Sequence, residues 1–239
     1  MLNARSATII LLGYLAAKVF CGVLIEVIAA VSGGMEGIRN QGVDRMLEHL
    51  IPPLLLPMHL LGVIVAVEMS FALIPNHLRD NSPCGAAWVR GSWSAIAQGL
   101  FIGLIIAACT HALSKATQSH VPYGDLGPVQ RMAYTPGLPR LIWAVGAVVL
   151  APPVEELLCR GVLYGGYRKS FGPAWAAVST TLIFVALHLP DSSHLPKLMV
   201  TSGVALAALW CRLRSQAIGP AIAVHVGYNT FITSTVFLS

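Results

Sequence analysis

Charged residues are scarce in this sequence. Lys, Arg, Asp and Glu together make up 10% of the 239 residues, hydrophobic residues make up 56%, and the mean hydropathy is +0.72. Soluble globular domains usually carry about 25% charged residues. The shortage of charge therefore excludes a soluble domain and places the chain in a lipid bilayer.

Cysteine is also scarce, and its spacing has no pattern. The five cysteines are odd in number, show no C-x-x-C pair and mostly lie in apolar runs. These features exclude a disulfide framework and a cysteine metal site, and we expect buried free thiols. The residues are Cys21, Cys84, Cys109, Cys159 and Cys211.

Basic clusters are missing as well, although the formal net charge is +5. The basic residues lie at the predicted helix ends, as in "WCRLR" (210–214) and "YRKSF" (167–171). A membrane protein that faces anionic lipid explains this pattern better than nucleic-acid binding does. Lys and Arg fall in nearly equal numbers on the two sides of the predicted spans, so the positive-inside rule does not orient the chain.

Long apolar runs dominate the sequence, and most reach the roughly 20 residues that a helix needs to cross a bilayer. They predict an all-α fold, a polytopic transmembrane helical bundle of about seven spans. The first run continues past Lys18 without a small-residue cleavage site, so we expect a retained helix rather than a signal peptide. The predicted spans are 6–31, 50–74, 93–113, 138–165, 172–189, 195–211 and 217–238.

The connections between the runs are short, and there is no internal repeat or low-complexity tract. We therefore expect one integrated membrane domain. Two stretches rich in Gly and Pro, 32–50 and 114–140, are expected to be loops that can include an interfacial helical turn. With no targeting extension ahead of the first run, a prokaryotic plasma (inner) membrane is the simplest expected location.

Polar residues inside apolar runs are costly in a bilayer and are functional candidates by default. In the second half of the chain they come in spaced pairs. The stretch "EELLCR" places Arg160 four residues after Glu156, on the same helix face, where the two charges can pair. Glu155 lies about 100° round the helix and stays available for another task. Pro152 and Pro153 suit a helix start or kink just before it.

Two further motifs supply polar groups at helical spacing. "FVALH" holds Phe184 and His188 four residues apart, and "HVGYN" holds His225 and Asn229 in the same way. At a rise of about 1.5 Å per residue, Glu155 and His188 lie about 22 and 27 Å from the turn between their helices. His225 and Asn229 lie about 17 and 22 Å from the turn before the last helix. The four polar groups can therefore meet in one plane, with a buried active site between the helices of the second half.

These groups suggest hydrolytic chemistry. A partly desolvated Glu155 would have a raised proton affinity and could act as general base toward a water held by His188. His225 and Asn229 can both donate hydrogen bonds to one oxygen, which a tetrahedral intermediate of peptide hydrolysis requires. Glu155 and the two histidines could instead hold a catalytic metal with an open position. The spacing alone does not separate these two mechanisms.

In this order, "EELLCR", "FVALH" and "HVGYN" resemble the EExxxR, FxxxH and HxxxN motifs of the CPBP family of intramembrane proteases. This family, also called the CAAX protease or Abi family, includes the Rce1-type prenyl-protein endopeptidases. The resemblance covers roughly residues 138–232. It implies a CPBP-like catalytic core at 138–239, preceded by N-terminal transmembrane helices at 1–137 whose role it does not define.

The resemblance implies a glutamate-type endopeptidase that hydrolyses a peptide bond of a membrane-associated or lipidated protein or peptide. Glu155 would activate the hydrolytic water with help from His188. His225 and Asn229 would form the oxyanion site.

The remaining motif residues would have supporting roles. Glu156 and Arg160 would support the helix arrangement, and Phe184 would serve packing. No cofactor is expected. A divalent metal such as zinc is less favoured, because the sequence has neither H-E-x-x-H nor a carboxylate-rich cluster.

Two other classes of function also keep polar residues in a membrane. A proton-coupled transporter would retain buried Glu and His, but it would more often show inverted repeats, and here the polar motifs lie only in the second half. A catalytically idle membrane scaffold or immunity protein is the second alternative, although all the motif residues are intact. The sequence has no G-x-S-x-G and no pair of intramembrane aspartates, so other classes of intramembrane protease fit less well.

Overall fold

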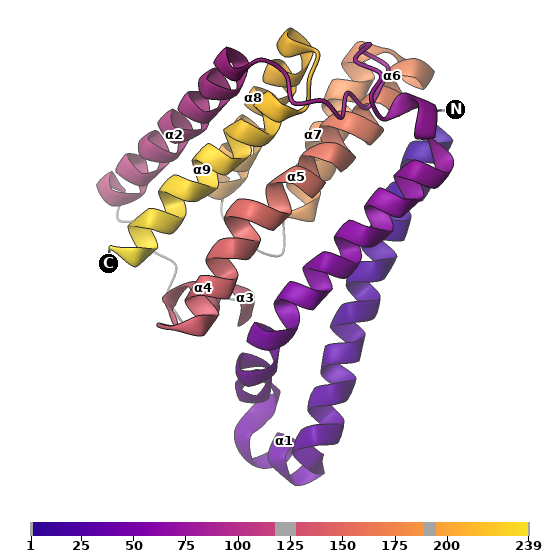
Figure 1. Cartoon of the computed structure of the whole chain (residues 1–239). Coiled ribbons are helices and arrows are strands. Elements are labelled where there is room, and N and C mark those ends of the chain that lie inside the picture. Colours follow the sequence, from indigo (N-terminus) through magenta and orange to yellow (C-terminus); the bar gives the residue numbers. More distant parts are fainter. Residues whose placement is uncertain (1, 118–127, 189–194, 239) are drawn as a thin grey trace.

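In the computed structural model the chain is all helical over the residues that the structure describes, which are 2–117, 128–188 and 195–238. Side chains are described there except at 25, 26, 28–30, 32–59, 63, 128 and 195–197. The long helices run side by side (Figure 1). In chain order the helices are α1 (Ala4–Leu73), η1 (Pro75–His77), α2 (Trp93–Ala116), α3 (Pro128–Tyr134), α4 (Leu138–Val145), η3 (Gly146–Leu150), α5 (Ala151–Glu156), η4 (Leu157–Leu163), α6 (Tyr164–Phe171), α7 (Pro173–Leu187), α8 (Leu195–Ser215) and α9 (Gly219–Phe237).

Helix α1 covers 70 residues, and a straight helix of that length would span about 105 Å. Its two ends instead lie side by side (Figure 1). A Cβ atom on Gly13 would meet the Met69 side chain, and one on Gly62 would lie 3.2 Å from the Tyr14 ring. The sequence predicted two helices joined by a loop over 32–50. That boundary is wrong, because the backbone is helical throughout and the stretch contains strong helix formers such as Met, Glu and Arg among its glycines.

The all-α prediction is confirmed for the described residues, whereas the number of spans stays a prediction. By length and composition, three described helices can cross a membrane: Ala4–Leu24, Trp93–Ala116 and Leu138–Phe171. Two shorter apolar helices, Leu60–Leu73 and Pro173–Leu187, accompany them.

Helices α4 to α6 follow one another without a break over Leu138–Phe171, and the predicted kink takes the form of two π-helical turns, η3 and η4, one on each side of α5. In η3 the N–H of Ala151 donates to the carbonyl of Gly146, five residues earlier. The next residue, Pro152, has no N–H to donate. The carbonyl of Ala147 therefore has no backbone N–H donor at the α-helical or the π-helical spacing. A carbonyl in this position needs a hydrogen-bond donor from elsewhere.

Helices α2 and α9 approach each other closely through small residues. A Cβ atom added to Gly99 would overlap the carbonyl oxygen of Pro220, and one added to Gly103 would overlap that of Val224. Ala107, four residues further along α2, is fully buried. Small residues four apart let transmembrane helices bring their backbones together. This contact fixes the position of α9, which carries the last of the polar motifs.

The stretch "WCRLR" predicted that Arg212 faces lipid at a helix end, but the residue has a different role. The residue is fully buried in α8, and its guanidinium donates to the carbonyl oxygens of Ser82 and Gly85 at 3.2 and 3.0 Å. The prediction is wrong for Arg212, because the segment 78–91 lacks regular structure over most of its length and needs side-chain donors for its carbonyls. Arg214 is exposed, as predicted.

The first helix shares a core with the helices of the second half. One buried cluster joins the N-terminal end of α1 to α5, η4 and α7. Its members include Leu2, Ala7, Ile10, Leu11 and Tyr14 from α1 and Val154, Leu157, Leu158, Val162 and Phe184 from the later helices. The position of α5 therefore depends on contacts from both halves of the chain.

All five cysteines are free thiols, as predicted. Cys21, Cys159 and Cys211 are buried and Cys84 is partly buried. Cys109 is exposed on α2, where the expectation of burial is wrong. An apolar run can face lipid as well as the core, so hydropathy alone does not distinguish the two positions.

Candidate active site

The two adjacent glutamates of α5 have different surroundings. Glu156 is fully buried, and its Oε1 atom accepts a hydrogen bond at 3.0 Å from Arg160, one turn further along the chain. The predicted ion pair is therefore present. A buried carboxylate and guanidinium compensate each other's charge, which makes both tolerable in an apolar interior. The Glu155 side chain is 17% exposed and lies on another face of the helix.

The same carboxylate orients His225 of α9. Glu156 Oε1 lies 3.1 Å from His225 Nδ1. An ionised carboxylate only accepts hydrogen bonds, so Nδ1 carries the hydrogen and donates it. The other ring nitrogen, Nε2, then faces Glu155, with Nε2 3.9 Å from Glu155 Oε2. The pair of Glu156 and Arg160 thus fixes the tautomer and the orientation of His225.

His188, at the C-terminal end of α7, is held in the same manner. Its Nδ1 atom lies 2.8 Å from the carbonyl oxygen of Phe184, one turn earlier. A carbonyl only accepts, so Nδ1 is again the donor. The opposite nitrogen, Nε2, lies 3.5 Å from Glu155 Oε2. The histidine ring is 28% exposed, so it is the member of the group most open to its surroundings.

Two imidazoles therefore present the same nitrogen to one carboxylate oxygen. Glu155 Oε2 is buried and makes no hydrogen bond to any described residue. With Nδ1 already committed on each ring, a proton shared with Glu155 must lie on Nε2 or on the carboxylate. The structure brings Glu155, His188 and His225 together as the helix depths predicted, and it arranges them around a site where a proton can be held or passed on.

Phe184 packs among the charged groups. Its ring is 1% exposed, and the Arg160 guanidinium lies over it, 4.0 Å from the ring centroid. The ring centroids of His188 and His225 lie 4.5 and 5.7 Å away. The residue therefore spaces the two imidazoles and supports the guanidinium through a cation–π contact.

Asn229 makes a contact that the sequence did not indicate. Its Nδ2 atom donates at 2.7 Å to the carbonyl oxygen of Ala147, the group that the π turn and Pro152 leave without a backbone donor. The side chain thus joins α9 to η3. An amide nitrogen carries two hydrogens, so one stays available to a ligand. The predicted oxyanion role can be combined with this structural one.

Over the part of the chain that the structure describes, no group of three or more His, Cys, Asp or Glu side chains has the arrangement needed to hold a metal ion. Because Nδ1 of His188 and Nδ1 of His225 already donate hydrogen bonds, each ring has only Nε2 left, and it faces the Glu155 carboxylate.

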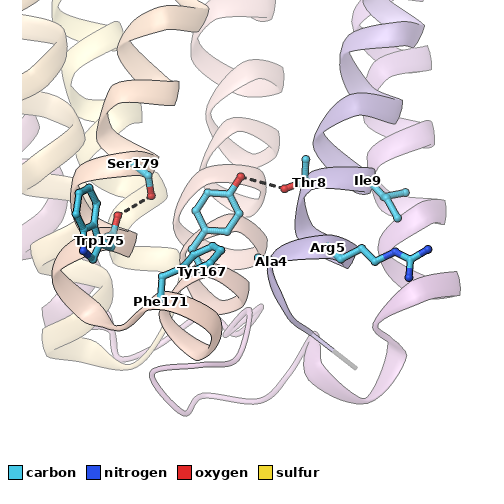
Figure 2. Close-up of a pocket in the computed structure, with 8 residues that line it drawn as sticks. All are labelled: Ala4, Arg5, Thr8, Ile9, Tyr167, Phe171, Trp175 and Ser179. Carbon is cyan, nitrogen blue, oxygen red and sulfur yellow. Dashed lines mark hydrogen bonds between the residues drawn. The ribbon is translucent and has the colours of Figure 1, made fainter.

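A separate groove of about 750 Å³ lies between the N-terminal end of α1 and helices α6 and α7 (Figure 2). A hydrogen bond of 3.0 Å between the hydroxyls of Thr8 and Tyr167 crosses it, and the Arg5 side chain points away from Tyr167 (Figure 2). None of the predicted site residues lines this groove. It is lined by Ala4, Arg5, Thr8, Ile9, Tyr167, Phe171, Trp175 and Ser179.

Over the described residues, the fold and the site combine apolar helices with a glutamate and two histidines whose side chains converge. Residues 137–231 match the model of a family described as type II CAAX prenyl endopeptidase, Rce1-like. The chain therefore contains an Rce1-like segment, which supplies all the residues of the three motifs and confirms the resemblance over that stretch. Comparison with curated proteins and with solved structures gave no match.

Proposed function

We propose that this chain is an intramembrane endopeptidase of the CAAX-protease type, an integral membrane enzyme that hydrolyses a peptide bond in a membrane-associated protein or peptide. We place it in a prokaryotic plasma membrane. The observation that carries the proposal is the convergence of two imidazole Nε2 atoms on the single oxygen Glu155 Oε2. This arrangement lies in the segment that matches a family of endopeptidases.

In the proposed reaction, Glu155 and His188 activate a water molecule. The water donates one O–H to Glu155 Oε2 and the other to His188 Nε2, which leaves its oxygen lone pair facing the substrate carbonyl carbon. As the new C–O bond forms, Glu155 accepts the proton and the carbonyl oxygen becomes negatively charged. When the C–N bond breaks, the same carboxyl group returns the proton to the leaving amine.

The negative oxygen of the intermediate requires hydrogen-bond donors. His225 Nε2 can donate only when the ring is an imidazolium, because Nδ1–H is directed to Glu156. The carboxylate of Glu156 stabilises that positive ring, and the second amide hydrogen of Asn229 completes the site. We propose this oxyanion role for His225 and Asn229, with Glu156, Arg160 and Phe184 in support.

The direct test is the Glu155→Gln variant, which keeps the shape of the side chain and removes the base. We expect cleavage to fall by at least about a hundredfold, the usual scale of a lost general base. Comparing protein termini in cells that carry wild-type or variant protein identifies the cleaved products. Glu68→Gln is the matched control, because Glu68 is an exposed glutamate on α1, outside the three motifs. Unchanged termini in cells with Glu155→Gln would contradict the proposal.

We propose that no step of the reaction needs a metal ion. Purified protein treated with a chelator should then keep its cleavage rate. Measuring that rate before and after chelation, and again after zinc is restored, tests this directly. Loss of activity that zinc reverses would favour a metalloprotease instead.

A further inference from the structure

A polar pocket lies outside the three motifs, where one helix ends and two others begin. It has a volume of about 560 Å³ and is formed by the start of α2, the end of α8 and the start of α9, which meet at one end of the molecule (Figure 1). This volume is within the usual range of small-molecule sites. The polar side chains that line it are Ser92, Ser94, Gln98, Arg214 and Ser215.

The pocket carries positive charge without a carboxylate to balance it. Helices α2, α8 and α9 contain neither Asp nor Glu. Asp80 is the one carboxylate in the segment between α1 and α2, and it faces His77 and the N–H of Ser82. Within the described part of the chain, the Arg214 guanidinium contacts the Trp210 ring and makes no hydrogen bond or ion pair. A guanidinium with its donors free favours an anionic ligand.

Two exposed tryptophans place the pocket at the level of the lipid headgroups. Trp93 follows Ser92 at the start of α2, and Trp210 lies one turn before Arg214 on α8. Each ring carries an arginine: Arg90 lies 4.2 Å from the centroid of Trp93, and Arg214 lies 5.2 Å from that of Trp210. Tryptophan is enriched where a membrane meets water. The pocket therefore opens where the phosphate groups of lipids lie.

We propose that this pocket binds the headgroup of an anionic phospholipid, with the lipid phosphate held by Arg214. Guanidinium and phosphate form paired, charge-assisted hydrogen bonds. The hydroxyl of Ser94 and the amide of Gln98 line the same pocket and can donate to further headgroup oxygens. The inference is independent of the proposed function, because no motif residue lines the pocket.

The lack of carboxylates decides which class of headgroup fits. A zwitterionic headgroup such as phosphocholine has a cation beside its phosphate. That cation would lie near Arg214, on helices that offer it no carboxylate, and like charges repel. The two tryptophan rings, which could hold such a cation, already carry arginines. A headgroup whose only charge is the phosphate, such as phosphatidylglycerol, is therefore preferred.

The test measures lipid binding to the purified full-length protein by native mass spectrometry, with phosphatidylglycerol, phosphatidylcholine and soluble glycerol phosphate as ligands. We expect phosphatidylglycerol to bind about tenfold more tightly than phosphatidylcholine, the scale of one hydrogen bond between charged groups. Glycerol phosphate has no acyl chains and should bind more weakly than either lipid. Equal affinities for the two lipids would overturn the inference, and tight binding of glycerol phosphate would overturn the assignment to lipid.

Two variants locate the site in the pocket. Arg214→Gln removes the phosphate contact and should weaken phosphatidylglycerol binding about tenfold, with phosphatidylcholine unaffected. Gln98→Glu keeps the shape of the side chain and brings a carboxylate into the pocket, so it should weaken the same lipid by repelling its phosphate. Both residues are exposed, so we expect unchanged unfolding temperatures in detergent.

Arg5→Gln is the matched control. Arg5 is another exposed arginine, but it lines the groove between α1, α6 and α7 and not this pocket. Its loss should leave the affinity for phosphatidylglycerol within about twofold, because salt screens exposed charges that lie far from the ligand. A loss as large as in Arg214→Gln would show a response to overall charge. That result, or an unchanged affinity in Arg214→Gln, would overturn the inference.

Discussion

Glu156 links the structural and the chemical parts of the site at the scale of single residues. One of its oxygens accepts from both Arg160 and His225. Removing one partner of a buried ion pair leaves an uncompensated charge in the interior, which costs about 3–5 kcal/mol. The residue that the sequence assigned to helix support therefore also determines which nitrogen of His225 faces Glu155.

We expect Glu156→Gln to lower both stability and activity, and the double variant Glu156→Gln with Arg160→Met to separate the two effects. The double variant removes both charges, so most of the lost stability should return. Activity should stay low, because His225 still lacks the carboxylate that stabilises its positive ring. Thermal unfolding in detergent and the cleavage rate measure the two effects. Recovery of activity together with stability would show that Glu156 is purely structural.

At the scale of helices, a close backbone contact joins α2 to α9. The stripe of Gly99, Gly103 and Ala107 on α2 holds α9 where Asn229 can reach the carbonyl of Ala147. Helices in a bilayer gain little from hydrophobic burial, so such close contact has to supply the attraction between them.

Gly103→Ala is expected to destabilise the protein by about 1–3 kcal/mol, because the new methyl group would overlap the Val224 carbonyl oxygen and force the helices apart. Gly203→Ala on α8 is the matched control, since nothing lies within 4 Å of its added Cβ atom. The control should be neutral or more stable by up to about 1 kcal/mol, because alanine favours helix. Equal unfolding temperatures for the two variants would contradict this account of the α2–α9 contact.

Short-range spacing predicted a large part of the site. Glu156 and Arg160 pair because residues four apart share a helix face, and His188 meets Glu155 because their helices return from a common turn. The contact of Asn229 with Ala147 could not be predicted from the sequence, because it depends on a π turn whose register shows only in the structure.

At the scale of the whole molecule, the sequence predicted an all-helical membrane protein but not how its halves combine. Apolar runs identify helices, whereas hydropathy does not say which face meets lipid and which meets protein. The reversal of α1 and the burial of Tyr14 against the second half depend on long-range packing. The two ends of α1 thus share a buried core with the helices that carry the first two motifs, and the single integrated domain stays a prediction.

The π turn before α5 has a consequence for how this chain can change in length. A π turn holds one residue more than an α turn, and in an α-helix Pro152 would clash with the carbonyl four residues earlier. A deletion of one residue within 146–150 would restore the α turn and that clash, so it would be tolerated only together with replacement of the proline. The extra residue of the π turn and Pro152 are therefore coupled, and homologous chains should have gained or lost the two together.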